Sequence, residues 1–477
     1  MAMITSIAWK NVWRNRTRSL TVISAMAVGV FAGVFTIAAM NSSVVQRIEE
    51  ALTVELNHIQ VNNKDFRNNT ELNNLLPGSD TLVDRLKAFT GVTDVTGRIL
   101  VNGIASTANK SSGVVIHGID VEKEKVMFAL DDKVIAGTGN FFGTATRFNT
   151  VLIGEKLARE LRIIRYILTP EQLERYERAT FPETLVTKVT PLFGRRFITE
   201  KKFGEALDSL LTPKEIRKYG HPLREAAWSF REGSRIILSF LDVNEVQTSA
   251  AFRICGVFRT NNDMFEGVSV FVPEAELREL TGLKEGVYHR LICRLADNDL
   301  TDKTTPAIRE AFSGAEVLSW KEIQPDMAML ADMMQQIYGI FMAVILAALA
   351  FGIVNTMLMA VLERTKELGM LAAIGMNRGK TFGMIMLESV FLSLTGGAAG
   401  MAISAIVIAV TTKNGINLVK YSEGMEAMAF SAHLFPTIDA PFFFITSLLI
   451  VLTGILSAIY PARKALKLNP LEALRTD

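Results

Sequence analysis

The sequence predicts an α-helical membrane protein with four transmembrane helices and a large α+β extracytoplasmic domain. Of its 477 residues, 49% are hydrophobic and yet 21% are charged. This mixture is typical of a chain that combines lipid-facing segments with a polar globular domain. The apolar residues are concentrated in four long runs, and one long region of mixed polarity separates the first run from the other three.

The four predicted spans each contain a charge-free run long enough to cross a hydrocarbon core of about 30 Å as a helix. We place them at residues 19–46, 336–362, 381–412 and 440–462. The first run is too long for the apolar part of a signal peptide, and no small-residue cleavage motif follows it, so we expect it to stay as a span.

The distribution of Lys and Arg predicts the orientation of the spans. Residues 1–18, the loop 363–380 and the tail 463–477 carry four basic residues each, whereas the loop 413–439 carries only Lys413 and Lys420. Because basic residues near span ends stay on the cytoplasmic side, both termini and the 363–380 loop are expected to be cytoplasmic. Residues 47–335 and 413–439 are then extracytoplasmic.

The N-terminal segment, residues 1–18, places Trp9 and Trp13 one helical turn apart among basic residues. This spacing favours a cytoplasmic helix lying at the membrane interface, where tryptophan is favoured. The alternative is a disordered basic leader.

The region from 47 to 335 contains repeated short runs rich in Val, Ile and Phe, with helical patterns between them, which predicts a mixed α+β domain. A helical insertion at about 163–231 interrupts this pattern. Two helices are expected to start within the insertion, at Thr169-Pro170 and at Thr212-Pro213. Each start combines a Thr N-cap with Pro at the first helical position. Basic residues outnumber acidic ones in the insertion. It is either a docking surface for a partner or for lipid headgroups, or a solvated decoration.

The sequence contains no pattern typical of a catalytic or metal site. The five histidines lie far apart, and the net charge of +2 does not indicate nucleic-acid binding. The segment from Gly375 to Thr381 resembles a phosphate-binding loop but has three residues between its glycines, where such a loop has four. Cys255 and Cys293 are expected to be free thiols, although a disulfide between them stays open.

The loop 363–380 predicts a short amphipathic helix in which Leu368, Leu371 and Ala372 share one face and Gly375 ends the helix. This apolar face must be covered either by a cytoplasmic partner or by another part of the same chain. Within the spans, two pairs of small residues predict close helix packing. The pairs are Gly29 with Gly33 and Gly396 with Gly400.

Three segments resemble the FtsX/MacB-like permeases, which are the type VII ABC transporters. E-R-T-K-E-L-G-M-L-A-A-I-G at 363–375 is similar to the coupling-helix signature of that family. Y-P-A-R-K-A at 460–465 with N-P-L-E-A-L-R at 469–475 is similar to its C-terminal signature, and A-W-K-N-V-W-R-N at 8–15 to its N-terminal segment. The order of one span, a large domain and three spans extends the resemblance over nearly the whole chain.

The resemblance implies a MacB-like periplasmic core with a porter-like subdomain, in a bacterial inner membrane. It implies that this chain catalyses nothing and holds no cofactor, because a separate cytosolic ATPase binds ATP and Mg. A second permease chain, identical or different, would complete the assembly. The residues implied for ATPase coupling are Glu363 and Glu367 as polar contacts, and Leu368, Leu371, Ile374 and Gly375 as the apolar face and helix end.

Within the family, V-N-G at 101–103, G-V-V-I-H-G-I-D at 113–120 and I-G-E-K-L-A at 153–158 most resemble the lipoprotein-releasing permeases LolC and LolE. Release of lipoproteins from the inner membrane is the implied function, with a periplasmic lipoprotein carrier and membrane lipids as further partners. Two features depart from the pattern: Ala372 stands where a basic residue is common, and the hairpin near 241–246 is too short for a carrier-binding hook.

Other functions stay open. The same kind of machine could expel a drug, peptide or toxin, as MacB does, or signal to a cell-wall hydrolase, as FtsX does. FtsX-type chains have a much smaller outer domain, and MacB carries its ATPase on the same chain. A membrane receptor or scaffold without an ATPase is the alternative from another class. The substrate and the identity of the ATPase are not determined by the sequence.

Overall fold

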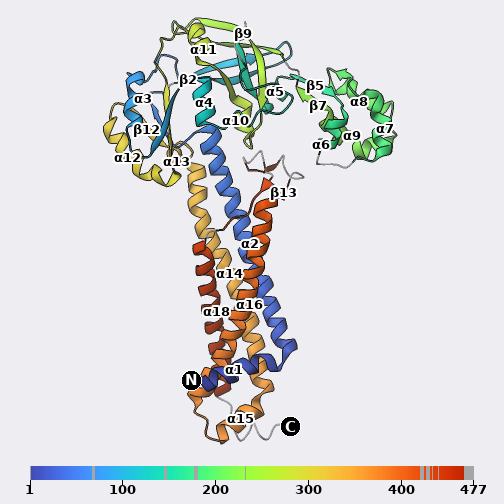
Figure 1. The fold of residues 1–477 in the computed structure, drawn as a ribbon, viewed down its shortest axis with the longest axis vertical. Helices are drawn as coiled ribbons and strands as arrows, with labels where there is room; N and C mark the ends of the chain where they lie inside the picture. The colour runs from blue at the N-terminus through green and yellow to red at the C-terminus, as the bar shows by residue number, and fades with distance from the viewer. Residues whose placement is uncertain are drawn as a thin grey trace. The chain divides into compact units, whose positions relative to one another are not determined.

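A computed structural model describes residues 2–66, 70–143, 148–176, 181–230, 233–418, 424–425, 430–431, 433–438 and 440–466. The chain divides into two compact units. The helical unit comprises Met1–Val45, Met329–Asn417 and His433–Asp477, and the globular unit comprises Gln46–Ala328 and Leu418–Ala432. The described residues contain four helices that are long and apolar enough to cross a membrane, and the globular unit mixes strands with helices, which confirms the predicted fold class (Figure 1).

The helical unit is a bundle of four long helices with two short ones at one end. The long helices are α2 (Arg16–Glu50), α14 (Pro325–Glu363), α16 (Arg378–Asn414) and α18 (Ala440–Leu466). The short helices are α1 (Ala2–Arg14), which lies across the end of the bundle, and α15 (Thr365–Ala373) (Figure 1). The long helices extend past the predicted spans by several residues because a helix continues into polar surroundings as long as its backbone bonds are kept. A two-residue strand pair, β13 (Ile416–Asn417) with β14 (His433–Leu434), lies between α16 and α18.

Small residues allow the long helices to approach closely. A Cβ added at Gly29 would lie 2.8 Å from the Leu349 side chain, and one at Gly400 would lie 2.8 Å from the backbone oxygen of Ala27. Added Cβ atoms at Gly33 and Gly396 would meet side chains of α14 and α2 at the same distance. The four glycines therefore lie where α14 and α16 pack against α2. Larger residues at these positions would push the helices apart.

The globular unit contains a four-stranded antiparallel sheet built from two interleaved β-α-β segments. Its strands lie in the order β12 (Glu316–Ser319), β1 (Ile59–Asn62), β11 (Arg290–Leu295) and β2 (Val92–Ser106). Helix α3 (Ser79–Lys87) connects β1 to β2, and α12 (Thr301–Ala311) connects β11 to β12. This is the split β-α-β arrangement. Apolar residues of one sheet face, including Ile59, Val61 and Leu291, are buried in a common core with Leu86 of α3 and Ile308 of α12.

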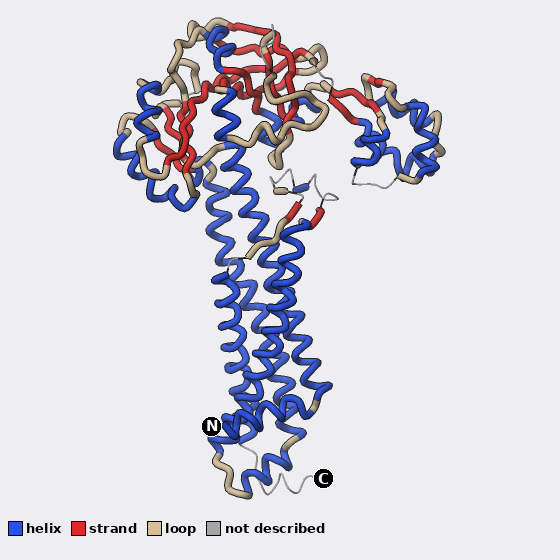
Figure 2. Tube along the Cα trace, viewed as in Figure 1, coloured by secondary structure: helices blue, strands red, loops and turns tan. Residues whose placement is uncertain are grey.

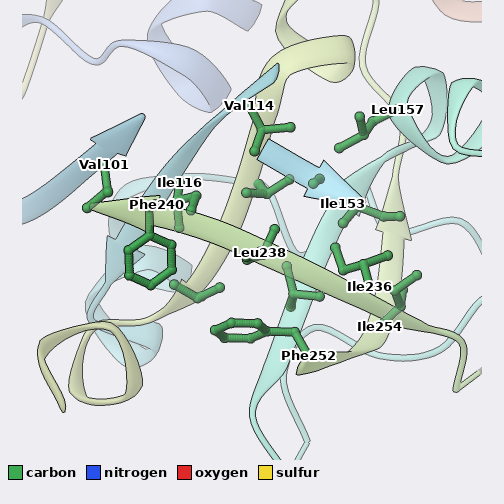
Figure 3. Packing of buried hydrophobic residues seen from close by; sticks show 14 of the residues in the cluster. Val101, Val114, Ile116, Ile153, Leu157, Ile236, Leu238, Phe240, Phe252 and Ile254 are labelled. Carbon is green, nitrogen blue, oxygen red and sulfur yellow. The ribbon is translucent and has the colours of Figure 1, made fainter. Parts of the chain in front are cut away.

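A closed barrel shares strand β2 with this sheet. The strands β3 (Ser111–Ile119), β10 (Ser269–Pro273), β4 (Thr150–Gly154), β9 (Gln247–Phe258) and β8 (Arg235–Leu241) follow β2 in order, and β8 pairs back onto the second half of β2. The strands of the globular unit are drawn in red in Figure 2. Closure removes the open sheet edge. The barrel interior is filled by inward-facing apolar side chains (Figure 3). These include Val101, Val114, Ile116, Ile153, Leu157, Ile236, Leu238, Phe240, Phe252 and Ile254.

Short helices complete the globular unit. They are α4 (Val121–Met127), α5 (Glu155–Glu160), α10 (Asp263–Val268), α11 (Glu274–Thr281), α13 (Trp320–Ile323) and a π-helix at Ala51–Glu55 that directly follows α2.

The insertion is a compact subdomain with its own core. It contains β5 (Ile164–Ile167), α6 (Pro170–Arg175), α7 (Glu183–Val189), β6 (Arg196–Phe197), α8 (Glu200–Asp208), α9 (Pro213–Ala227) and β7 (Trp228–Phe230). Thr169 and Thr212 form capping boxes, which confirms both predicted helix starts. Besides its helices, the insertion contains a small sheet in which β6, β5 and β7 pair. Leu168, Phe203 and Leu223 are fully buried in the core of this subdomain.

Candidate functional site

The candidate site lies at the end of the bundle that carries the N-terminus, where α1, α15 and the first turns of α16 meet. Helix α14 ends at Glu363, and only Arg364 separates it from α15. The C-terminus of α15 is closed by Gly375, whose φ of +94° is left-handed, and by a hydrogen bond of 2.9 Å from the Met376 N–H to the Leu371 carbonyl. This is a Schellman motif, which requires a residue such as glycine at this position.

A network of hydrogen-bonded charges ties the three helices together, with Arg364 at its centre. Arg364 Nη1 lies 3.0 Å from Glu388 Oε1 of α16, and its Nε lies 3.0 Å from Glu367 Oε2 of α15. From α1, Asn11 Nδ2 donates to Glu388 Oε1 at 2.6 Å, and Arg14 Nη2 donates to Glu367 Oε1 at 2.8 Å. Each carboxylate therefore joins α1 to Arg364.

The two carboxylates of the network differ in environment. The side chains of Arg364 and Glu388 are 12% and 7% exposed, so this ion pair is buried, whereas Glu367 and Arg14 are 42% and 53% exposed. Burial opposes ionisation of Glu367, but hydrogen bonds from Arg14 and Arg364 outweigh it and hold its pKa below the usual value. Burial likewise opposes the charge of Arg364, but Glu388 and Glu367 outweigh it and raise the Arg364 pKa. Glu367 and Arg364 are therefore charged at neutral pH, and the buried pair of Arg364 with Glu388 is the stronger restraint.

Aromatic packing and one further ion pair strengthen this end of the bundle. The Trp9 ring of α1 contacts Phe391 of α16 edge to face, with centroids 5.4 Å apart, and contacts Trp13 at 5.9 Å. Arg18 Nη1 near the start of α2 lies 2.9 Å from Glu363 Oε2 at the end of α14. Helix α1 is thus packed onto α16, and α2 is joined to the residue that precedes Arg364.

The six residues predicted for coupling are placed differently from one another. Glu363 and Glu367 are bound by arginines of this chain. Leu368 is buried in the bundle core and Leu371 packs against the same core, so the predicted apolar face rests on the chain's own helices. Ile374 is 85% exposed, and Gly375 is exposed beside it.

Sequence reasoning missed Met370, which is 51% exposed and lies one turn before Ile374. Lys366, Met370 and Ile374 recur at a spacing of four, which places them on the side of α15 away from Leu368. This spacing was a readable signal. The outward apolar surface of α15 is therefore Met370 with Ile374.

Sequence reasoning also missed the surroundings of Glu388, an acidic residue within the predicted span 381–412. Glu388 is buried and accepts hydrogen bonds from Asn11 and Arg364, because those two side chains are held over α16 by α1 and by the α14–α15 connection. Its partners were missed, although an acidic residue inside an apolar span indicates a nearby partner. Within the described part of the chain, no group of three or more His, Cys, Asp or Glu side chains is arranged to hold a metal ion.

A bundle of four apolar helices, with a large α+β unit between the first and the second, defines a polytopic membrane protein with a folded domain outside the bilayer. Residues 339–470 match the family described as FtsX-like permease C-terminal, so this region of the chain is similar to the FtsX-like permeases. The matched range contains α15 and most of the network. Residues 469–475 of the C-terminal signature lie outside the described residues.

Curated relatives are ABC transporter permeases. Over 166 residues the chain is 29% identical to the ABC transporter permease YknZ of Bacillus subtilis (strain 168). This alignment covers 34% of this chain and 36% of YknZ. Over 230 residues it is 30% identical to the macrolide export ATP-binding/permease protein MacB of Chlorobium luteolum. This alignment covers 48% of this chain and 29% of MacB. The chain thus spans about a third of the length of these relatives.

Among solved structures, the periplasmic region of MacB from Actinobacillus actinomycetemcomitans is 12% identical, covers 59% of this chain and 98% of that one, and has a TM-score of 0.28. A score this low supports no conclusion. The specific resemblance to LolC and LolE rests on the short sequence motifs and stays a prediction.

Proposed function

We propose that this chain is the permease component of an ABC transporter and that Met370 and Ile374 of α15 form its contact with a separate cytosolic ATPase. The observation that carries the proposal is the structure of α15 within the matched permease region. A short helix between two spans is fixed to α1 and α16 by charges and presents two exposed apolar side chains at its free end. Exposed apolar side chains on such a helix are typical of a site that a partner covers.

The network around Arg364 would transmit a movement of the ATPase to the helices of the bundle. A displacement of α15 by the ATPase would act on Glu388 of α16 through Arg364 and on α1 through Glu367 and Arg14. ATP and Mg would be bound by the ATPase, and two permease chains would form the moving pair. Because the cycle requires two arrangements of that pair, ATP must bind one of them more tightly than the other.

The substrate of the transporter is a separate part of this proposal. We favour lipoproteins, on the resemblance of residues 101–120 and 153–158 to LolC and LolE. Removing acyl chains from a bilayer requires about 0.8 kcal/mol per CH₂, which is work that calls for ATP. Export of a small molecule is the second candidate, because the relative MacB is named for macrolide export.

The docking proposal is tested by Ile374→Asp, with Ile198→Asp as the matched control. Both isoleucines are highly exposed, at 85% and 73%, but Ile198 lies in the insertion. Tagged protein purified in mild detergent should co-purify a cytosolic ATPase, detected by vanadate-sensitive ATP hydrolysis and identified by mass spectrometry. We expect Ile374→Asp to abolish co-purification and Ile198→Asp to leave it unchanged. Glu367 is a poor test site, because its substitution would also break its bonds to Arg14 and Arg364.

Two results would contradict the proposal. Absence of an ATPase from the wild-type preparation would favour a receptor or scaffold. Equal ATPase recovery with Ile374→Asp would place the contact elsewhere on the chain. The substrate is tested separately by depleting the protein: lipoproteins retained in the inner membrane would support release, whereas increased macrolide sensitivity with normal lipoprotein sorting would support export.

A further inference from the structure

The four-stranded sheet of the globular unit has a polar face opposite its apolar core. Because side chains alternate along a strand, Ile59 and Val61 of β1 point into the core and Gln60 and Asn62 point the other way. Across this second face, Asn62 lies between Arg290 of β11 and Glu316 of β12. Gln60 and Asn62 are nonetheless 1% and 4% exposed. A buried polar face of this kind needs partners for its hydrogen-bonding groups.

A cavity of about 170 Å³ opens on this face. At a share of roughly 30 Å³ per water molecule, it has room for several waters or for one small organic group. Its lining combines four polar side chains with three apolar ones, Phe66, Leu318 and Ile323. The polar four are Gln60, Asn62, Thr70 and Arg290. The cavity therefore suits a ligand that is itself part polar and part apolar.

Arg290 brings a positive charge to the cavity, and Glu316 of β12 on the same sheet face favours that charge without forming an ion pair with it. Its Nε donates to Asn62 Oδ1 at 2.9 Å, and it forms no ion pair with any carboxylate in the described ranges. The neighbouring Arg98 is bonded to Glu124, so that carboxylate is already engaged. Burial and the charge of Arg98 lower the pKa of Arg290 to about 10, which leaves it charged at neutral pH. An anion beside Arg290 would be stabilised by this charge.

Gln60 adds a requirement for a hydrogen-bond donor. Its Nε2 donates to the Leu56 carbonyl at 3.0 Å, so the orientation of the amide is fixed. Its Oε1 is buried and has no hydrogen-bond partner among the residues that the structure describes. On the same sheet face, Thr96 Oγ1 and Glu316 Oε2 also lack partners within those residues. Acceptors left in this state are unfavourable, so a ligand with an N–H group would gain by binding here.

We propose that this cavity binds a carboxylate carried on an apolar residue with an acylated amine, the chemistry of a peptide C-terminus or of a small N-acylated amino acid. The carboxylate would bind Arg290, the amide N–H would donate to Gln60 Oε1, and the apolar side chain would pack against Phe66, Leu318 and Ile323. This site is independent of the ATPase contact, because every group in it belongs to the globular unit.

The test uses the full-length chain in lipid nanodiscs and measures binding by isothermal titration calorimetry. The probes are N-acetyl-leucine, its neutral amide N-acetyl-leucinamide, N-acetylglycine and the tripeptide N-acetyl-Ala-Ala-Leu. We expect N-acetyl-leucine to bind at least tenfold more tightly than its amide, and N-acetylglycine to bind more weakly because it lacks the apolar side chain. Comparable or tighter binding of the tripeptide would identify a peptide C-terminus as the source, and binding of the single residue alone would identify a small free acid.

The protein variants are Arg290→Met, Arg290→Lys and the control Lys303→Met, which removes an exposed charge from α12 of the same subdomain. Arg290→Met should weaken N-acetyl-leucine binding at least tenfold, Arg290→Lys should retain part of it, and Lys303→Met should leave it unchanged. Melting curves identify any variant that fails to fold, and Gln60→Leu then serves as the second variant, with weaker binding of the acid expected. Equal binding of acid and amide, the same affinity in Arg290→Met and Lys303→Met, or no binding to wild type at millimolar probe would overturn the proposal.

Discussion

Replacing Arg364 by Met tests whether the buried ion pair holds the end of the bundle together. The substitution removes the charge that lies 3.0 Å from Glu388 and leaves that carboxylate buried, with the Asn11 amide as its remaining polar contact among the described residues. Removing one partner of a buried pair typically destabilises a protein by about 3–5 kcal/mol. By contrast, Arg18→Met breaks a more exposed pair with Glu363 and should change stability by about 0–1 kcal/mol.

The assay is reversible unfolding in mixed micelles with increasing SDS, followed by tryptophan fluorescence. Trp9 is a suitable reporter because it packs on Phe391 of α16. A double-mutant cycle with Glu388→Met separates the pair from the individual substitutions, since the double variant leaves no unpaired charge in the core. We expect a coupling energy of about 2–3 kcal/mol, with the double variant more stable than Arg364→Met alone.

A coupling energy near zero would refute this reasoning. It would mean that Arg364 and Glu388 are each solvated independently, and the proposed path from α15 to α16 would lose its structural basis. Equal destabilisation by Arg364→Met and Arg18→Met would lead to the same conclusion, because it would remove the distinction between the buried and the exposed pair.

Three further predictions follow from packing and burial. Gly400→Ala should destabilise the bundle by about 1–3 kcal/mol in the same assay, because the new Cβ would lie 2.8 Å from the α2 backbone. The control Gly352→Ala should be neutral or stabilising, because an added Cβ there would meet nothing within 4 Å. Burial lowers the pKa of His289 from 6.5 to about 4, so the unfolded chain takes up the proton first as the pH falls below 6.5. His289 alone should therefore cost about 2 kcal/mol of stability at pH 5, in addition to the losses from His58 and His117, and His289→Gln should remove that share. Burial raises the thiol pKa of Cys255 to about 11 and of Cys293 to about 12, and both are free, so iodoacetamide at pH 8 should label them only after unfolding.

The features predicted correctly from the sequence are those that depend on local chemistry. Four charge-free runs required helices because lipid leaves the backbone no other partner. The capping boxes at Thr169 and Thr212 needed only residues within one turn, and Gly375 ended α15 through its own left-handed conformation. Each of these outcomes is determined by residues that are neighbours in the sequence.

The remaining features depend on contacts between distant residues. Strand β1 pairs with β11, whose residues follow it by more than two hundred positions, and the barrel closes through β8 and β2. In the candidate site, periodicity identified the residues that share a face of α15 but not what covers that face. The Arg14–Glu367 and Asn11–Glu388 bonds are made by α1, which precedes α15 by some 350 residues. No pattern within α15 contains that information.

Helix α2 extends without a break from the helical unit into the globular unit. It is one helix from Arg16 to Glu50, so it belongs to both units, and it carries polar contacts near each end. Near its start, Arg18 is paired with Glu363 beside the α15 network. Near its end, Arg47 forms a buried ion pair of 2.8 Å with Glu55 in the following π-helix, and Glu50 accepts the backbone N–H of Asn261 at 3.1 Å. The unbroken backbone of α2 therefore places the residue paired with Glu363 and the residue of the buried Arg47–Glu55 pair on one helix.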